Sequence, residues 1–314
     1  MKILITDDVH PFLLTEFEKR NYDFDYLPKI SLAECKEICP QYDGLIINSK
    51  IKVDKDFLSR AINLRWIARL GSGMEIIDIP EAYARNIYLI STPEANCNAV
   101  AEHVLGLLLS LFRHIPRANS EVKLNDWRRE QNRGAEIRSK NIGIIGFGHT
   151  GSSFARLLAG FGANIIIFDK YKQLNENTDR YRLVKSLSQL QEEAEVISLH
   201  LPLTDETRYL VNELFIAENK NPFYLLNSSR GQIVDTVALI SGLRSGKVLG
   251  AGLDVFENEK PSSYTPTESE LYDKLFKMDN VICTPHIAGW THESKLLIAQ
   301  TVLKKLENML NLNI

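Results

Sequence analysis

Short apolar runs alternate with amphipathic stretches over the first 97 residues. The runs are short and rich in β-branched side chains, which is typical of buried parallel strands. They predict strands over residues 3–6, 22–26, 44–47, 66–70 and 88–90. The amphipathic stretches between them predict helical segments over residues 11–20, 32–38, 55–61 and 80–85. Strands that alternate with helices favour a parallel sheet with helices on its faces.

The same alternation continues beyond residue 140. An apolar run over 142–145 leads into Gly146-Phe147-Gly148-His149-Thr150-Gly151, a helical pattern follows, and a second apolar run over 165–168 ends on Asp169. Further strands are predicted over 196–201, 224–227, 248–255 and 281–284. Polar residues follow each of them, where ligands bind in a doubly wound sheet.

The order strand, G-x-G-x-x-G, helix, strand, acid predicts a dinucleotide site. Gly146 permits a tight turn, Gly148 lets the backbone approach a pyrophosphate, and Gly151 lets helix and strand pack closely. The helix N-terminus offers free N–H groups to the phosphates. Asp169 can accept both ribose hydroxyls and would repel a 2′-phosphate, so the cofactor is predicted to be NAD and not NADP.

Two long helices lie outside this alternation. Residues 99–116 are apolar over most of their circumference, so this helix is predicted to be buried. Its place between two α/β halves favours a helix that joins domains, although a core helix of one domain has the same pattern. A last helix over 291–312 could cross back to the first half.

Composition narrows the class of protein. A chain of 314 residues predicts about two domains. A hydrophobic content of 44%, a charged content of 25% and a net charge of −3 give no reason to expect nucleic acid or anionic membrane as a partner. No apolar run reads as a membrane span and no signal pattern precedes the first strand, so a cytoplasmic location is expected. The four cysteines are interpreted as reduced thiols, and no metal site is expected.

Three residues at strand ends are candidates for catalysis. His286 can transfer a proton near neutrality, Glu259 could pair with it, and Arg230 offers a planar fork for a carboxylate. The amides of Gly71-Ser72-Gly73 could hold the other carboxylate oxygen. Taken singly, each has a plainer reading: a structural histidine, a solvated glutamate, a surface arginine.

Motifs along nearly the whole chain resemble the D-isomer-specific 2-hydroxyacid dehydrogenases, and most closely their short-form D-3-phosphoglycerate dehydrogenases. The motifs are Ala68-Arg69-Leu70-Gly71-Ser72-Gly73, Ala101-Glu102-His103, Gly146 to Gly151, His200-Leu201-Pro202-Leu203-Thr204, Asn227-Ser228-Ser229-Arg230-Gly231, Leu253-Asp254-Val255-Phe256 with Glu259, and Thr284-Pro285-His286-Ile287-Ala288-Gly289.

The resemblance implies an α/β fold of two Rossmann-like, doubly wound parallel-sheet domains with an interdomain cleft. Residues 1–98 plus 290–314 would form a flavodoxin-like substrate domain, and 99–289 the NAD domain. Helix 99–116 would join the domains and contribute to a homodimer. Arg230 would orient the substrate carboxylate, His286 would transfer the proton, and Glu259 would sustain its basicity. The implied cofactor contacts are Ser72, Gly146, Gly148, His149, Thr150, Gly151, Asp169, His200, Leu201, Pro202, Ser228, Ser229, Asp254 (to the nicotinamide carboxamide) and Gly289.

The resemblance also implies an oxidoreductase that interconverts a D-2-hydroxy acid and a 2-oxo acid with NAD. The leading substrate pair is 3-phosphoglycerate and 3-phosphohydroxypyruvate, as in serine biosynthesis, with Lys50, Arg69, Gly71, Ser72, Gly73 and Arg129 as substrate contacts. Asn48 stands where that subfamily commonly carries an arginine, a departure that Lys50 or Lys52 would have to compensate. No C-terminal serine-sensing domain follows, so no serine feedback through such a domain is expected. The alternatives are a hydroxypyruvate or glyoxylate reductase and, more remotely, an NAD-sensing protein of the C-terminal binding protein type.

Overall fold

The computed structural model describes residues 1–172 and 181–311, and the chain divides into two compact units. Unit 1 contains residues 1–96 and the C-terminal segment from Trp290, and unit 2 contains Cys97–Gly289. Residue 312, the expected end of the last helix, and residues 313–314 of the expected substrate domain lie outside the described residues. Each unit is described by itself below.

Unit 1 contains a five-stranded parallel sheet in the order β2-β1-β3-β4-β5, which is the flavodoxin-like doubly wound order. Its strands are β1 (Lys2–Ile5), β2 (Asp23–Tyr26), β3 (Gly44–Ile47), β4 (Trp66–Arg69) and β5 (Tyr88–Ile90). Its helices are α1 (Pro11–Lys19), α2 (Leu32–Ile38), η1 (Cys39–Gln41), α3 (Lys55–Arg60), α4 (Ile79–Ala84) and α12 (His292–Asn311).

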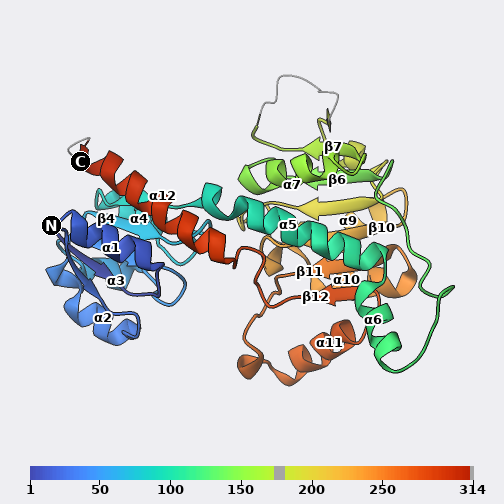
Figure 1. The fold of residues 1–314 in the computed structure, drawn as a ribbon, viewed down its shortest axis with the longest axis horizontal. Helices are drawn as coiled ribbons and strands as arrows, with labels where there is room; N and C mark the ends of the chain where they lie inside the picture. The colour runs from blue at the N-terminus through green and yellow to red at the C-terminus, as the bar shows by residue number, and fades with distance from the viewer. Residues whose placement is uncertain (173–180, 312–314) are drawn as a thin grey trace. The chain divides into compact units, whose positions relative to one another are not determined.

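Alternate side chains of these strands face opposite layers of helices, as the two-residue period of a strand requires. Ile3 and Ile5 pack with α1 and α12 on one face, whereas Leu4 and Leu45 pack with α2 and α3 on the other. Helix α12 lies beside α1 (Figure 1), so the chain's last described helix completes the core of the first unit.

Unit 2 contains a seven-stranded parallel sheet in the order β12-β11-β10-β9-β6-β7-β8. Its strands are β6 (Asn141–Ile145), β7 (Asn164–Phe168), β8 (Arg182–Leu183), β9 (Val196–Leu199), β10 (Phe223–Asn227), β11 (Val248–Leu253) and β12 (Val281–Cys283). Its helices are α6 (Ile115–Lys123), α7 (His149–Ala159), α8 (Leu187–Gln191), α9 (Glu213–Glu218), η2 (Gly231–Ile233), α10 (Thr236–Ser245), η3 (Pro261–Ser263) and α11 (Pro266–Phe276). The strand order reverses between β6 and β9, which is where doubly wound sheets bind ligands.

The long apolar helix differs from its expected bounds. Helix α5 spans Pro93–Phe112 instead of 99–116, so it starts in unit 1 and continues into unit 2. It begins early because proline is favoured in a first helical turn. It ends early because His114 adopts a left-handed backbone (φ 51°), after which α6 starts as a separate helix.

By length and composition alone, α5 is long and apolar enough to cross a membrane, contrary to the expectation that no apolar run of this chain has that length. Val104, Leu107, Leu108 and Leu111 are nevertheless buried in the core of unit 2. We therefore interpret α5 as a core helix.

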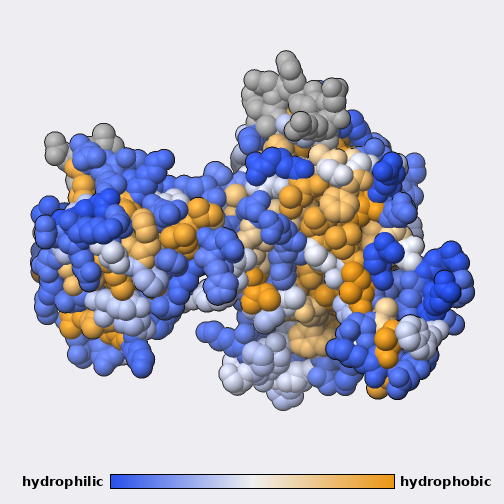
Figure 2. Space-filling view, in the orientation of Figure 1, coloured by the Kyte–Doolittle hydropathy of each residue, from blue (hydrophilic) through white to orange (hydrophobic). Residues whose placement is uncertain are grey.

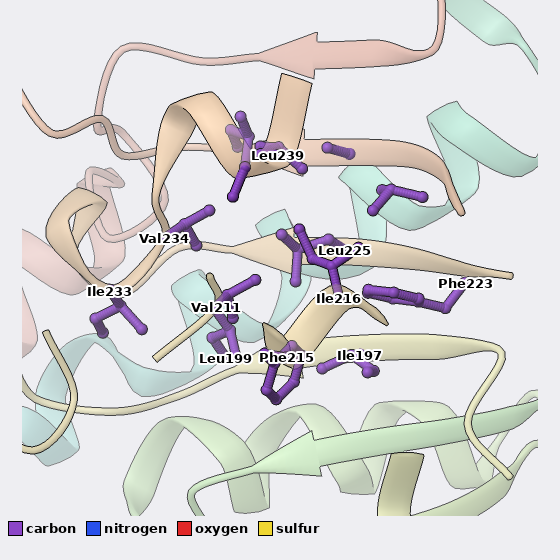
Figure 3. Packing of buried hydrophobic residues seen from close by; sticks show 14 of the residues in the cluster. Ile197, Leu199, Val211, Phe215, Ile216, Phe223, Leu225, Ile233, Val234 and Leu239 are labelled. Atoms are coloured by element: carbon purple, nitrogen blue, oxygen red, sulfur yellow. The ribbon is translucent and has the colours of Figure 1, made fainter. Parts of the chain in front are cut away.

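The opposite face of the same sheet carries a second apolar core. Ile197 and Leu225 project from β9 and β10 toward Phe215, Ile216 and Leu239 of α9 and α10 (Figure 3). With both faces of the sheet buried, the strands are apolar almost throughout, and the polar residues fall at their ends.

The packing of the sheet in unit 1 can be tested at Gly44. A Cβ at this position would lie 2.1 Å from Cζ2 of Trp66, a side chain that is 1% exposed. We expect Gly44→Ala to lower the free energy of unfolding by roughly 1–3 kcal/mol, measured by urea denaturation, because overpacking forces the indole to move.

Trp66→Leu provides the control, because it removes the atoms that the new methyl group meets. In that background Gly44→Ala should cost about 1 kcal/mol less than in the wild type, the coupling expected of groups in contact. Strictly additive costs would exclude the steric explanation.

Candidate active site

Three loops of unit 2 carry the candidate catalytic residues. Arg230 follows β10, Glu259 follows β11, and His286 follows β12. These strands are parallel neighbours in the sheet, so their carboxyl ends meet at one edge.

The turn that holds Arg230 is shaped by a buried asparagine. Asn227, 1% exposed, accepts a hydrogen bond from the amide of Ser229 (3.0 Å) and donates one to the carbonyl of Arg230 (3.0 Å). Nη1 of Arg230 also donates to the carbonyl of Ser229 (2.6 Å). The side chain of Asn227 therefore fixes the backbone from which the guanidinium extends.

The loop of Arg230 is pressed against the loop of Glu259. A Cβ at Gly231 would lie 1.9 Å from the carbonyl carbon and oxygen of Phe256, so no other residue fits there without backbone movement. Gln232 adds a hydrogen bond from Nε2 to the carbonyl of Glu257 (2.8 Å). The close approach brings the guanidinium and the carboxylate to the same edge of the sheet.

The predicted histidine and glutamate form a pair. Nδ1 of His286 lies 2.8 Å from Oε2 of Glu259, and the two side chains are 48% and 37% exposed. Because Glu259 occupies Nδ1, the other ring nitrogen, Nε2, is the one that can exchange a proton with a bound molecule.

The charge of Glu259 is set by opposing effects. Burial by itself raises the pKa of the carboxyl, but the hydrogen bond and charge of His286, the amide of Phe256 and the nearby Arg230 guanidinium outweigh it and hold the pKa below its usual range. Glu259 is therefore ionised at neutral pH and can hold the ring in one orientation.

Asp254, at the end of β11, is fully buried. Its Oδ1 accepts hydrogen bonds from the hydroxyl of Thr284 (2.6 Å) and the amide of Ile287 (2.9 Å), and Oδ2 accepts one from the amide of Ala288 (2.8 Å). Both oxygens are thus bound within the protein. The expected contact of Asp254 with a nicotinamide carboxamide stays a prediction.

The glycine loop after β6 fits a dinucleotide. Gly146 has a φ of +92°, and a Cβ there would lie 2.3 Å from the carbonyl oxygen of His200. A Cβ at Gly151 would lie 2.1 Å from the carbonyl oxygen of Gly146, so loop and helix are in contact. A Cβ at Gly148 would meet open space, which leaves room for a phosphate. Within residues 1–172 and 181–311 no side chain caps α7, so the amides of its first turn, at His149 and Thr150, point to that space.

Asp169 stands at the end of β7, beside this loop. Its carboxylate accepts hydrogen bonds from the amides of Phe147 (2.7 Å), Tyr171 (3.0 Å) and Lys172 (2.8 Å). Burial by itself raises the pKa of Asp169, but these amides and the charge of Lys172 outweigh that effect. The pKa of Asp169 therefore lies below its usual value. A permanent negative charge here favours ribose hydroxyls over a 2′-phosphate.

The residues after β9 pack against the glycine loop that follows β6. His200 is neutral, because burial lowers its pKa to about 3, and its Nε2 lies 2.9 Å from the hydroxyl of Ser198. The amide of Leu201 donates to the hydroxyl of Ser229 (3.2 Å), which itself donates to the carbonyl of Leu199 (2.7 Å). These bonds join the ends of β9 and β10.

The remaining expected cofactor contacts lie near these groups. The carbonyl of Pro202 accepts a hydrogen bond from Thr207 (2.7 Å), and Gly289 is the last residue of unit 2. The hydroxyl of Ser228 is buried and has no hydrogen-bond partner among the described residues. An unsatisfied buried hydroxyl at a strand end is consistent with a ligand that would complete it.

Some of the expected substrate contacts come together in unit 1. A Cβ at Gly71 (φ +141°) would lie 1.6 Å from Nη1 of Arg69, so the guanidinium lies directly over the turn. Ser72 donates from its hydroxyl to Oδ1 of Asn96 (3.0 Å), and Gly73 directly follows the bend over residues 70–72. A guanidinium over backbone amides suits a carboxylate.

Lys50 has a different environment. Its ammonium donates to the carbonyls of Thr6 (2.5 Å) and Pro28 (2.9 Å). The backbone of Asn48 donates to Asp7 (3.0 Å), which places a carboxylate beside the position where an arginine was expected.

Arg129 is exposed, and within unit 2 it lies away from the strand ends that carry His286. Leu107 and Leu111 of α5 lie over Gly252 and Gly250 respectively, so α5 runs antiparallel to β11. The amide of Ala135 donates to the carbonyl of Phe112 (2.8 Å), which anchors the segment that carries Arg129 near the amino ends of the strands (Figure 1).

Sequence reasoning missed several residues that shape the site. Asn227 and Gly231 were noted only as parts of a motif, and Tyr272, whose hydroxyl accepts a bond from the amide of Asn258 (2.9 Å), was not noted at all. A polar or glycine residue that directly flanks a candidate at a strand end is the signal that could have found the first two. Among residues 1–172 and 181–311, no group of histidine, cysteine and acidic side chains could hold a metal ion.

The pairing of His286 and Glu259 has a measurable electrostatic consequence. His286 has a left-handed backbone (φ 56°), which asparagine tolerates, but asparagine carries no charge. We therefore expect His286→Asn to raise the pKa of Glu259, because burial then opposes ionisation with less compensation. The carboxyl ¹³C shift of Glu259, followed by NMR titration, measures this change.

Glu195 is an internal control for that titration. Burial raises its pKa, but Lys140 and the amide of Asn141 lower it, and neither is near His286 in the sequence. Its titration should stay the same in the variant. A Glu259 pKa that does not rise would mean that the imidazole contributes nothing to its ionisation.

Comparison with known proteins shows which family this chain resembles. The family model for the NAD binding domain of D-isomer specific 2-hydroxyacid dehydrogenases matches residues 105–288. A hydroxypyruvate reductase of Thermotoga maritima is 37% identical over 294 residues, which cover 94% of this chain and 92% of that protein. A D-3-phosphoglycerate dehydrogenase of Bacillus subtilis is 34% identical over 89% of this chain, but the match covers only 52% of that longer protein.

A solved structure of a dehydrogenase has a similar fold. The D-lactate dehydrogenase of Aquifex aeolicus, complexed with NAD and lactic acid, superimposes with a TM-score of 0.83 at 27% identity and covers 99% of this chain and 96% of its own. The expected α/β fold with Rossmann-like parallel sheets and the NAD cofactor are therefore confirmed. The chain belongs to the D-isomer-specific 2-hydroxyacid dehydrogenases, NAD-dependent oxidoreductases.

Proposed function

We propose that this protein reduces a small, unphosphorylated 2-oxo acid, such as hydroxypyruvate or glyoxylate, to the D-2-hydroxy acid. The observation that carries the proposal is the His286–Glu259 pair, 2.8 Å apart, on the same sheet edge as Arg230. NAD, when bound, exchanges the hydride. The chain's own residues orient the acid and move the proton.

Arg230, His286 and Glu259, which we call the catalytic triplet, each have one task. Arg230 offers parallel N–H donors to the substrate's carboxylate and adjacent carbonyl oxygen. His286, protonated, donates the Nε2 proton to that oxygen as it gains charge, and takes it back in the reverse reaction. Glu259, ionised, holds Nδ1 and stabilises the imidazolium.

Gly146, Gly148 and Gly151 with the first turn of α7 would hold the pyrophosphate of NAD, and Asp169 would hold its adenosine ribose. The amides of Gly71-Ser72-Gly73 and the guanidinium of Arg69 would bind a carboxylate of the substrate. We keep these assignments as parts of the proposal.

The contacts of Lys50 argue against a phosphorylated substrate. Both carbonyls that it binds would lose a partner if the ammonium turned toward a phosphate. Asn48 supplies no charge, and Asp7 beside it would repel an anion. The extensive match to a hydroxypyruvate reductase supports the same choice over 3-phosphoglycerate and serine biosynthesis.

The homodimer expected from the sequence is also part of the proposal. Apolar side chains of α6 and the segment after it are exposed: Ile115 (51%), Val122 (45%), Leu124 (80%) and Trp127 (75%). Apolar residues also gather on the visible face of unit 2 (Figure 2). Exposed apolar groups of this size favour a protein partner, and a second copy matches the expectation.

Activity on a substrate panel tests the reaction. Oxidation of NADH should be fastest with hydroxypyruvate or glyoxylate among hydroxypyruvate, glyoxylate, pyruvate and 3-phosphohydroxypyruvate. His286→Asn should lower kcat by at least about 100-fold while NADH still binds, because it removes the proton donor. NADH binding with no turnover of any acid by the wild type would instead favour the NAD-sensing binding protein.

His114→Asn is the matched control, because His114 also has a left-handed backbone (φ 51°) and lies outside the triplet. It should leave kcat within about twofold of the wild type. An equal loss in both variants would remove His286 from the chemistry.

Lys50→Met tests the choice between phosphorylated and unphosphorylated acids. Because the ammonium binds two carbonyls, the ratio of kcat/KM for 3-phosphohydroxypyruvate to that for hydroxypyruvate should change by less than about threefold. A selective loss of about tenfold or more on the phosphorylated acid would assign Lys50 to the phosphate and reverse the substrate choice.

A further inference from the structure

His286 has a backbone that side chains rarely adopt. Its φ is +56°, in the left-handed region, where residues other than glycine are uncommon. Such a conformation persists only where the surrounding structure holds it. The orientation of the ring toward Glu259 therefore depends on whatever fixes residues 286–288.

The end of β11 supplies that support. The amide of His286 donates to the carbonyl of Asp254 (2.8 Å), and the amides of Ile287 and Ala288 donate to the two oxygens of its carboxylate (2.9 and 2.8 Å). Three successive amides thus bind one fully buried residue. A shift of that carboxylate would move the catalytic loop.

Two side chains hold the carboxylate in turn. The hydroxyl of Thr284 donates to Oδ1 of Asp254 (2.6 Å), so its oxygen is left to accept from Nε2 of His103 (2.9 Å). Nε2 of His103 also lies 3.5 Å from Oδ1. A chain of hydrogen bonds therefore runs from α5, through Thr284 and Asp254, to the loop of His286.

We propose that Thr284 and His103 are positioning residues for His286. Their hydrogen bonds fix the Asp254 carboxylate, the carboxylate fixes the left-handed backbone, and the backbone aims the imidazole at Glu259. Neither residue touches the reacting atoms. The proposal rests on the proposed function for its kinetic consequences, and on the structure alone for its geometric ones.

Thr284→Val tests it with little change in shape. The methyl group replaces the hydroxyl, so one bond to Asp254 is lost and His103 loses its acceptor. We expect kcat to fall by about 10- to 100-fold, the effect of a small misplacement of a catalytic group. The KM for the 2-oxo acid and the Kd for NADH should change by less than about threefold, which separates lost positioning from lost binding.

Conservative variants complete the kinetic test. Thr284→Ser, which keeps the hydroxyl, should restore kcat to within about threefold of the wild type. His103→Gln, which keeps an N–H donor, should retain more activity than His103→Leu. Tyr224→Phe is the control, because its ring packs against Phe112 at the C-terminal end of α5 and not against His103; its kcat should not change.

Crystal structures of the Thr284→Val and Thr284→Ser proteins give a readout that needs no activity. In the valine variant, His286 should leave the left-handed region or its Nδ1 should lie more than about 3.5 Å from Oε2 of Glu259. The serine variant should keep both features. If the wild type reduces no 2-oxo acid, the proposed function fails, and these structures still decide the positioning.

Three results would overturn the proposal. They are a valine variant with kcat within threefold of the wild type, a serine variant as impaired as the valine variant, and a His286–Glu259 geometry that is the same in the valine variant. Any one of them would reduce the hydrogen-bond chain to ordinary core packing.

Discussion

The hydrogen bonds of the buried Asp254 carboxylate are the constraint on which the catalytic edge of unit 2 depends. A fully buried carboxyl group is costly unless hydrogen-bond donors surround it, and here they come from Thr284, Ile287 and Ala288. Satisfying its oxygens therefore folds the loop after β12 back onto β11. The same bonds also place His286 beside Glu259.

The acid–base pair shows how the site balances burial against charge. Glu259 is sufficiently enclosed for burial to raise its pKa, yet the imidazole, an amide and the Arg230 guanidinium keep it ionised. Gly231 contributes to this balance, because only a residue without Cβ lets the loops of Arg230 and Phe256 approach so closely. Steric fit between the two loops thus brings the guanidinium near the carboxylate.

The cofactor half of the site uses backbone geometry more than side-chain chemistry. Gly146, Gly148 and Gly151 leave room, respectively, for a carbonyl of the next strand, for a ligand, and for the helix to pack. Asp169 adds a charge whose ionised state is held by three amides. The proposed phosphate site and the preference for NAD therefore follow from where the chain turns.

The alternation of strands and helices and the glycine loop with Asp169 could be predicted from the sequence, and Arg230, Glu259 and His286 could be selected from it as catalytic candidates. These are local signals, because periodicity, spacing and residue type can be seen in the sequence without the three-dimensional structure. The early end of α5 at Phe112 depended on a left-handed residue, His114, that no periodicity marks. Three contacts depend on tertiary packing: Lys50 binds two carbonyls, both oxygens of Asp254 bind groups within the protein, and His103 contacts Thr284, 181 residues away in the chain. Such contacts join distant segments through the packing of whole elements, and the free energy that selects them is not carried by any one stretch of residues.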